Sequence, residues 1–131
     1  MLAVTEFIQK VGTYYLGTTD GDQPEMRPIG IFKEYDGKIY TAVGQHKKVF
    51  EQIMRNPKVE ICCLGEGAKW IRLRAVAKMA SDEIVQRVFA ENPFLTRLYN
   101  EENGHKLGVL ELTEATVEWC SMMGPDRVEK L

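Results

Sequence analysis

The stretch KWIRLRAVAKM, residues 69–79, alternates between apolar and charged side chains. One face of an extended chain would carry only apolar residues, namely Ile71, Leu73, Ala75, Ala77 and Met79. The opposite face would carry Trp70, Arg72, Arg74 and Lys78, with Val76 as its one aliphatic member. A period of two residues is typical of a strand that is buried on one face and solvated on the other. The chain is therefore expected to fold around a β-sheet.

Further β-prone runs, separated by turn residues, extend this sheet along most of the chain. We expect strands over residues 13–19, 25–35, 38–43 and 58–64, and two closing strands within residues 106–121. Asp36 and Gly37 stand between two of these runs, which is a strong signal for a β-hairpin. Residues 122–131 are expected to form a tail.

Helical periodicity is found outside these strands. Amphipathic patterns predict helices over residues 3–11, 47–56 and 81–93, and a short helix after Pro93 that runs into an acidic loop. Gly12 is expected to cap the end of the first helix. The elements favour a single domain over residues 1–131, mainly β, built as a six- to seven-stranded antiparallel barrel with peripheral helices.

The overall composition narrows the possible functions. A net charge of −2 argues against a nucleic-acid-binding protein. No apolar run approaches the roughly 20 residues that span a bilayer, and the N-terminus lacks the features of a signal peptide. The three cysteines, Cys62, Cys63 and Cys120, lack CxxC spacing and are expected to be free thiols in a reducing cytoplasm. The two histidines, His46 and His105, lie far apart in the sequence, which argues against a metal site or a catalytic triad.

Two lysines occupy an unfavourable place at the start of the second predicted helix. Lys47 and Lys48 fall in its first turn, where the helix dipole is already positive and a misplaced charge costs about 0.3–1 kcal/mol. A bound phosphate would use both the free backbone N–H groups and the two ammonium groups, and Arg27 could add a bidentate contact. The alternative that these cations are merely solvated surface residues stays open at this point.

The segment MRPIGIF…DGKIYTAVGQHKKVFEQIMRNPKVEI, followed by WIRLRAVAKM, resembles the pyridoxamine 5′-phosphate oxidase-like family, the FMN-binding split β-barrels. The resemblance runs from about residue 3 to residue 120 and, in length, is closest to small members related to the nitroimidazole-resistance (Nim) flavoproteins. It implies a split barrel that binds FMN as a homodimer, with two flavins at the subunit interface.

The resemblance also implies which residues contact the cofactor. Those expected to border the ring or the phosphate are Arg27, Pro28, Ile29 and Gly30. Those expected to touch the ring through backbone groups are Thr41, Ala42 and Val43, and those expected to hold the phosphate are Lys47 and Lys48. Arg72 would lie at the pyrimidine edge of the flavin, and Trp70 or Trp119 would be the aromatic residue that often comes from the partner.

The function expected from this reading is that of a cytoplasmic FMN-dependent oxidoreductase of unknown substrate, with Nim-like nitroreduction among the activities considered. No dedicated catalytic acid or base and no metal ligands are identified. Because the terminal MMGPDRVEKL does not match the segment through which the full oxidases help bind pyridoxal phosphate, we do not expect that oxidase activity. Three alternatives remain open: a flavin or haem module without turnover, with His105 as the haem ligand, a deazaflavin-dependent reductase, and a nucleic-acid-binding barrel, against which the net charge counts.

Overall fold

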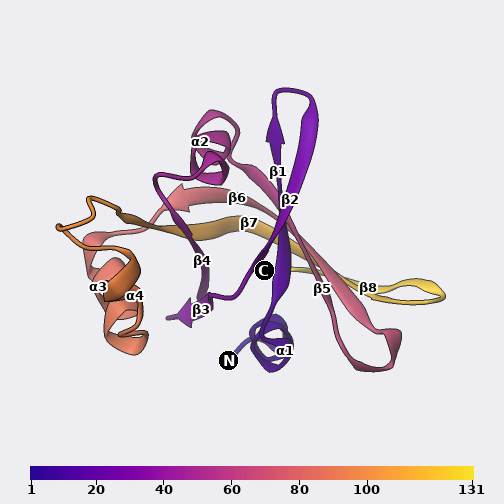
Figure 1. Cartoon of the computed structure of the whole chain (residues 1–131). Coiled ribbons are helices and arrows are strands. Elements are labelled where there is room, and N and C mark those ends of the chain that lie inside the picture. The colour runs from indigo at the N-terminus through magenta and orange to yellow at the C-terminus, as the bar shows by residue number, and fades with distance from the viewer.

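Eight strands form one antiparallel sheet that curls around a core, and the helices lie around it (Figure 1). The computed structural model describes all residues from 1 to 131. The strands are β1 (Tyr14–Asp20), β2 (Gln23–Ile29), β3 (Phe32–Tyr35), β4 (Lys38–Gly44), β5 (Lys58–Leu64), β6 (Trp70–Met79), β7 (Leu107–Ser121) and β8 (Gly124–Lys130). The helices are α1 (Ala3–Val11), α2 (Lys48–Arg55), α3 (Asp82–Glu91), α4 (Leu95–Leu98) and the 3₁₀ turn η1 (Glu66–Ala68). No helix combines the length and apolar character that crossing a bilayer would require.

The order of the strands explains why the barrel is split. The order is β2-β1-β5-β6-β7-β4-β3, with β8 pairing with β7. Strands β2 and β3 follow each other in the chain, yet they stand at the two ends of this order, so the sheet is not closed. The predicted antiparallel split-barrel fold with peripheral helices is confirmed, with eight strands in place of six or seven.

The segment 25–35, predicted as one strand, is divided into β2 and β3. Strand β2 pairs with β1 as far as Ile29, whereas β3 starts at Phe32 and pairs with β4. Gly30 and Ile31 carry the chain between these two partners, and the Ile31 carbonyl accepts a hydrogen bond from the Tyr14 hydroxyl. Pro28 thus lies in the edge strand β2, where its missing N–H costs no ladder hydrogen bond on the open side, and the chain leaves this strand two residues later.

The C-terminal part of the sheet also departs from the sequence prediction. The two strands expected within residues 106–121 form one continuous strand, β7. A β-bulge shifts its pairing register with β6, and the strand continues through this bulge. Glu114, at φ 50°, and Ala115 stand opposite the single residue Ala75 of β6. The tail predicted from residue 122 onward is strand β8, which is held by its pairing with β7.

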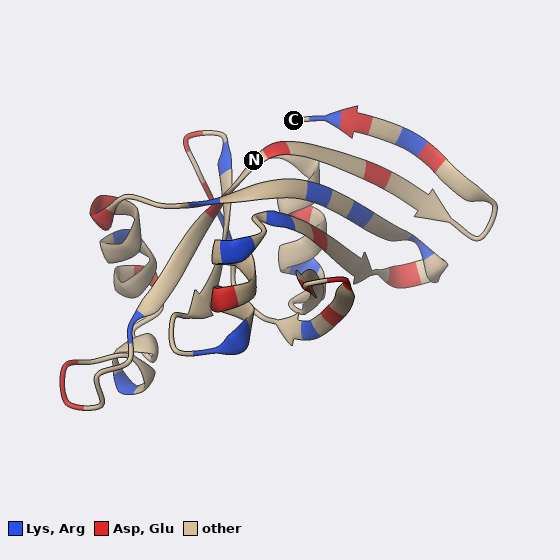
Figure 2. Cartoon of the chain, turned by 90° about the horizontal axis from the view of Figure 1, so that it is seen from above, with Lys and Arg blue, Asp and Glu red and all other residues tan.

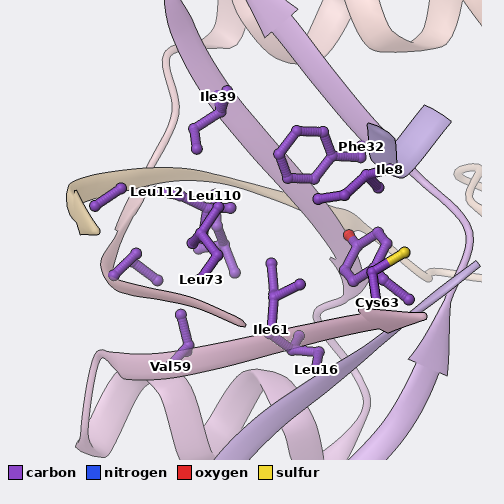
Figure 3. Packing of buried hydrophobic residues seen from close by; sticks show 14 of the residues in the cluster. Ile8, Leu16, Phe32, Ile39, Val59, Ile61, Cys63, Leu73, Leu110 and Leu112 are labelled. Carbon is purple, nitrogen blue, oxygen red and sulfur yellow. The ribbon is translucent and has the colours of Figure 1, made fainter. Parts of the chain in front are cut away.

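The core lies on the inner face of the curled sheet and is closed by α1 and α2 (Figure 3). Its members include alternate residues of β1, β5 and β6, such as Leu16, Ile61 and Leu73, all at 0% exposure. The alternation in residues 69–79 thus predicted the buried face of β6 correctly from Ile71 to Ala77, while Met79 is 43% exposed. A second cluster packs α3 and α4 against β4 and β7.

The start of α1 is held by a carboxylate from β3. Glu34 Oε1 accepts hydrogen bonds from the Leu2 amide at 2.9 Å and from the Thr5 hydroxyl at 2.7 Å. Burial raises the pKa of the Glu34 carboxyl, but these two bonds and the N-terminal ammonium outweigh it, so the pKa lies below its ordinary value of 4.5. The ionised Glu34 carboxylate therefore contributes its full stabilisation at pH values above 4.5, the ordinary pKa. This contribution is lost as the pH falls through the lowered pKa of the folded protein.

We expect Glu34→Gln to lower the free energy of unfolding by about 1 kcal/mol at pH 7, since charged hydrogen bonds at α1 are lost. The difference between the two proteins should shrink below pH 4.5 and vanish once the native carboxyl is protonated. Urea denaturation from pH 7 to pH 3 measures it. A gap that stays constant over this range would contradict the assigned role.

Candidate functional site

The turn between β4 and α2 brings the two predicted phosphate-binding lysines to one corner. Lys47 is the N-cap of α2, with an extended backbone, and no side chain caps the helix. Its amide donates to the Gly44 carbonyl at 3.1 Å, which joins the helix start to the end of β4. The side chains of Lys47 and Lys48 are exposed and make no ion pair. The first amides of a helix lack intrahelical acceptors, so this corner offers N–H donors and two ammonium groups to an anion.

The adjoining edge of β4 is free of a strand partner. Strand β3 pairs with β4 only as far as Thr41, whereas β4 continues to Gly44. The side chains of Thr41 and Val43 are buried in the main core, and that of Ala42 packs in the cluster under α3. These three residues can therefore reach a ligand only through backbone groups, and the part of β4 beyond β3 has an open edge for that purpose.

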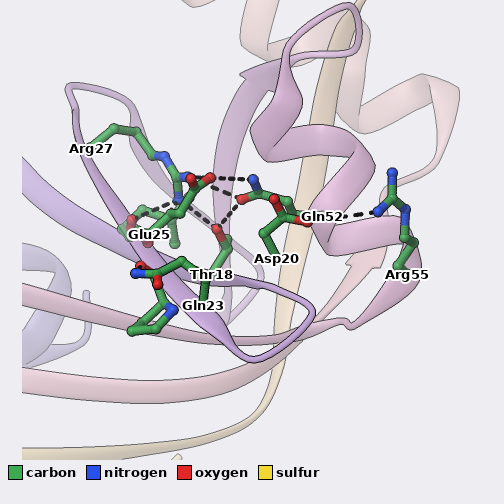
Figure 4. Close-up of polar contacts among 9 residues, drawn as sticks. Thr18, Asp20, Gln23, Glu25, Arg27, Gln52 and Arg55 are labelled. Carbon is green, nitrogen blue, oxygen red and sulfur yellow. Dashed lines mark hydrogen bonds and ion pairs between the residues drawn. The ribbon is translucent and has the colours of Figure 1, made fainter.

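Arg27 points inward and is held by partners from β1 and α2 (Figure 4). Its guanidinium donates to the Leu16 carbonyl at 3.0 Å, to the Thr18 hydroxyl at 2.7 Å and to Gln52 Oε1 at 3.1 Å. Gln52 is only 3% exposed, and its amide donates in turn to the Glu25 carboxylate. Burial lowers the pKa of Arg27, and Glu25 opposes that shift.

This network fixes α2 to the β1–β2 hairpin. Gln52 lies one helical turn beyond Lys48, so Arg27 acts on the helix that carries the lysines. A phosphate would have to compete with the existing partners of Arg27. Sequence reasoning did not identify Gln52, although a polar residue on the apolar stripe between Val49 and Ile53 was the available signal.

Arg72 lies on the outer face of the sheet and is balanced by carboxylates. Its guanidinium is 2.9 Å from Glu118 and 3.3 Å from Glu60, and it lies over the Trp70 ring at 5.1 Å. Arg74 shares both carboxylates, at 2.9 Å from Glu60 and 3.7 Å from Glu118. Blue and red bands accordingly lie side by side on these strands in Figure 2. The cation expected at a flavin edge is thus already paired within the chain.

Within one chain, Arg72 and the end of β4 pair with distant parts of strand β7. Both strands pair with β7, where Arg72 stands opposite Glu118 and Thr41 stands opposite Leu110. Those positions are eight residues apart, or roughly 26 Å along the strand. Leu110 is also buried in the core, whereas the Arg72 row faces outward.

The other predicted residues lie at three different places. Pro28 is exposed on the outer face of β2, and Ile29 packs partly against the core. Gly30 borders a hollow of about 230 Å³ between α1 and β3. Trp119 lies on the inner side of the sheet, edge-to-face with Phe7 of α1 at 5.8 Å. The structure therefore brings Lys47 and Lys48 to the end of β4, and Gln52 links Arg27 to the helix that carries these lysines. The two tryptophans lie elsewhere.

The two histidines, distant in sequence, meet beside this corner. The rings of His46 and His105 stack with centroids 3.8 Å apart and an interplanar angle of 10°. Burial, His105 and Lys47 all lower the pKa of His46, which favours a neutral ring. Sequence spacing gave no signal for this pair, because it depends on how residues 99–107 return to β4.

A family model for pyridoxamine 5′-phosphate oxidase matches residues 2–124. The chain belongs to the pyridoxamine 5′-phosphate oxidase family. A solved NimC/NimA family protein from Clostridium acetobutylicum is 33% identical, with 98% of this chain and 91% of that chain covered at a TM-score of 0.85. No protein of curated function matches the chain.

Two more distant structures share the fold of this pyridoxamine 5′-phosphate oxidase family member. An FAD-binding protein from Mesorhizobium loti is 16% identical, with 92% of this chain and 96% of that one covered at a TM-score of 0.59. A heme-binding protein from Mycobacterium smegmatis is 15% identical, with 100% of this chain and 58% of that one covered at a TM-score of 0.67. Identities this low show the fold alone.

Proposed function

We propose that this family member binds FMN and acts as a flavin-dependent oxidoreductase. The observation that carries the proposal is the uncapped start of α2, where exposed Lys47 and Lys48 adjoin the open edge of β4. An anionic phosphate offsets the charge placed at this helix start, and a flat ring beside it would meet backbone donors and acceptors. An FAD-binding protein of the same fold gives further support.

The roles of the residues follow from this placement. Lys47, Lys48 and the first amides of α2 hold the phosphate, and backbone groups of residues 42–44 orient the ring. Arg27 and Gln52 keep α2 in position against the β1–β2 hairpin. When bound, the flavin supplies the electron and hydride transfer, and the protein supplies orientation and electrostatics.

We further propose that the protein is a homodimer in which the outer face of the sheet meets a second copy. Large apolar side chains are exposed on this face, with Tyr15 at 48%, Met26 at 63% and Leu64 at 62%. Pro28 and Trp70 lie on the same face. Since Arg72 lies on this outer face and far along β7 from the β4 corner of its own chain, we propose that it serves the flavin site of the partner.

The spectrum of the protein purified without added cofactor tests the proposal. We expect flavin absorbance, release of FMN rather than FAD on denaturation, and twice the 15.0 kDa chain mass by light scattering. A Soret band would instead identify the protein as a haem-binding module, and a deazaflavin spectrum would identify a deazaflavin reductase. Nitroaromatics, quinones and vitamin B6 phosphates, each with reduced nicotinamide donors, form the first substrate screen.

A further inference from the structure

A second pocket lies beside the β4–α2 corner, between α3, the end of β6 and residues 99–107. Its volume is about 570 Å³, which is in the range of small-molecule sites. Neither Lys47 nor Lys48 lines it. Nothing in the proposed flavin function requires this pocket.

The pocket has an apolar floor built from several elements. The apolar lining residues are Met79, Ala80, Val85, Phe89, Tyr99 and Leu107. Phe89, Val85 and Tyr99 are half-buried against the cluster under α3, so their inner edges are fixed by packing. A flat ring could replace water over this floor.

The wall formed by residues 99–106 is ordered by its own hydrogen bonds. The Asn100 and Asn103 side chains each accept from a backbone amide of the loop, at Asn103 and His105, both at 2.9 Å. The Asn103 amide group also donates to the Leu98 carbonyl at 3.0 Å. The pocket is thus pre-formed, which lowers the entropic cost of binding.

Polar groups without protein partners converge on one end of the pocket. The Tyr99 hydroxyl and the ring nitrogens of His105 make no hydrogen bond within the chain, and His105 is held in place by its stack on His46. Burial raises the pKa of Tyr99, so its hydroxyl stays protonated and able to donate. Lys106 also lines the pocket and adds one ammonium group to its lining.

Two carboxylates also line the pocket. Asp82 lies in the first turn of α3, where the helix N-terminus offsets its charge. Glu101 lies in the exposed loop, where its charge is screened by solvent. Neither carboxylate accepts a hydrogen bond from Tyr99 or His105.

We propose that this pocket binds a small aromatic carboxylate, with its ring over Val85 and Phe89 and its carboxylate at the Tyr99 hydroxyl and the His105 ring. Both donors can bond carboxylate oxygens, and the Lys106 ammonium in the same lining can pair with the ligand's charge. The ligand would lie beside the β4–α2 corner without displacing anything that the flavin uses.

Benzoate is the probe, and amide chemical shifts of the ¹⁵N-labelled full chain are the measurement. We expect saturable shifts at Val85, Phe89, Tyr99 and His105 with a millimolar or tighter dissociation constant, in flavin-loaded and flavin-free protein alike. Acetate, which lacks the ring, and benzylamine, which reverses the charge, should bind at least 10-fold more weakly. Shifts confined to Lys47 and Lys48, or no saturable shifts at all, would overturn the proposal and leave the flavin assignment untouched.

Two variants of α3 form a matched pair. Val85→Trp fills the pocket and should abolish benzoate binding, whereas Gln86→Trp places the same ring on the exposed side of α3 and should leave it unchanged. Tyr99→Phe keeps the ring, preserves the packing and should weaken benzoate by about 10-fold, since one charge-assisted hydrogen bond is lost. Unchanged affinity in both Val85→Trp and Tyr99→Phe would refute the site even if one variant were poorly folded.

Discussion

Replacing Lys47 and Lys48 together by alanine is expected to weaken FMN binding on the order of 100-fold, because two charge-assisted contacts of at least about 1.5 kcal/mol each are lost. The fold should not suffer, since both side chains are exposed and unpaired. Removing two cations from a helix N-terminus should in fact leave the stability unchanged or raise it slightly. Quenching of flavin fluorescence on titration measures the affinity, and urea denaturation of the flavin-free protein measures the stability.

Two controls separate phosphate binding from a general loss of charge. Lys10→Ala with Lys69→Ala removes the same charge from exposed positions in α1 and before β6, and should leave FMN affinity within about 2-fold. Riboflavin lacks the phosphate, so its affinity should be the same in the native protein and in the Lys47 and Lys48 variant. Equal losses for FMN and riboflavin would show that the lysines act on the ring or on the fold instead.

Local signals in the sequence predicted local structure well. Gly12 ends α1 at φ 93° with its amide bonded to the Ile8 carbonyl, as its place after an amphipathic run indicated. Asp36 and Gly37 both have positive φ, 52° and 77°, and join β3 to β4 as the hairpin signal indicated. The helix predicted over residues 81–93 begins as α3 directly after Ser81, whose hydroxyl accepts a hydrogen bond from the Ile84 amide. Each of these features depends on a few consecutive residues, which is why one sequence was enough.

Features that depend on distant partners were not predictable in the same way. Whether residues 25–35 form one strand or two is decided by β1 and β4, which pair with different parts of that segment. Strand β8 contains a proline and four charged residues in seven, a composition that reads as a tail. It is a strand because β7 continues past β4 and offers it an unpaired edge.

The residues of the candidate site also differ in whether local sequence or distant partners decide their positions. The unfavourable charge at the start of α2 was visible in the sequence, since the position of a lysine in a helix follows from periodicity. The direction in which Arg27 points, and the pairing of Arg72 with Glu60 and Glu118, depend on strand register and on Gln52. Their roles at a flavin remain predictions for that reason.

Two variants that each bind FMN weakly are expected to form a heterodimer with one tight FMN site, if each site is built from residues of both copies. Lys47→Ala with Lys48→Ala damages the phosphate corner, and Arg72→Ala removes the residue that a partner would contribute. In a heterodimer, one site would combine both defects, while the other would join intact lysines from one copy with an intact Arg72 from its partner. Co-refolding the two chains with different tags, isolating the heterodimer and titrating it with FMN tests this directly.

The expected stoichiometry is one tightly bound FMN per heterodimer, with native affinity, while each parent homodimer binds weakly at both sites. A site built within a single chain cannot behave in this way, because every chain in the mixture carries one of the defects. Refolding each variant with a differently tagged copy of itself is the control for the procedure. A heterodimer without a tight site would show that Arg72 does not contact the partner's flavin. Its role would then be the ion pair with Glu118 of its own chain, at 2.9 Å.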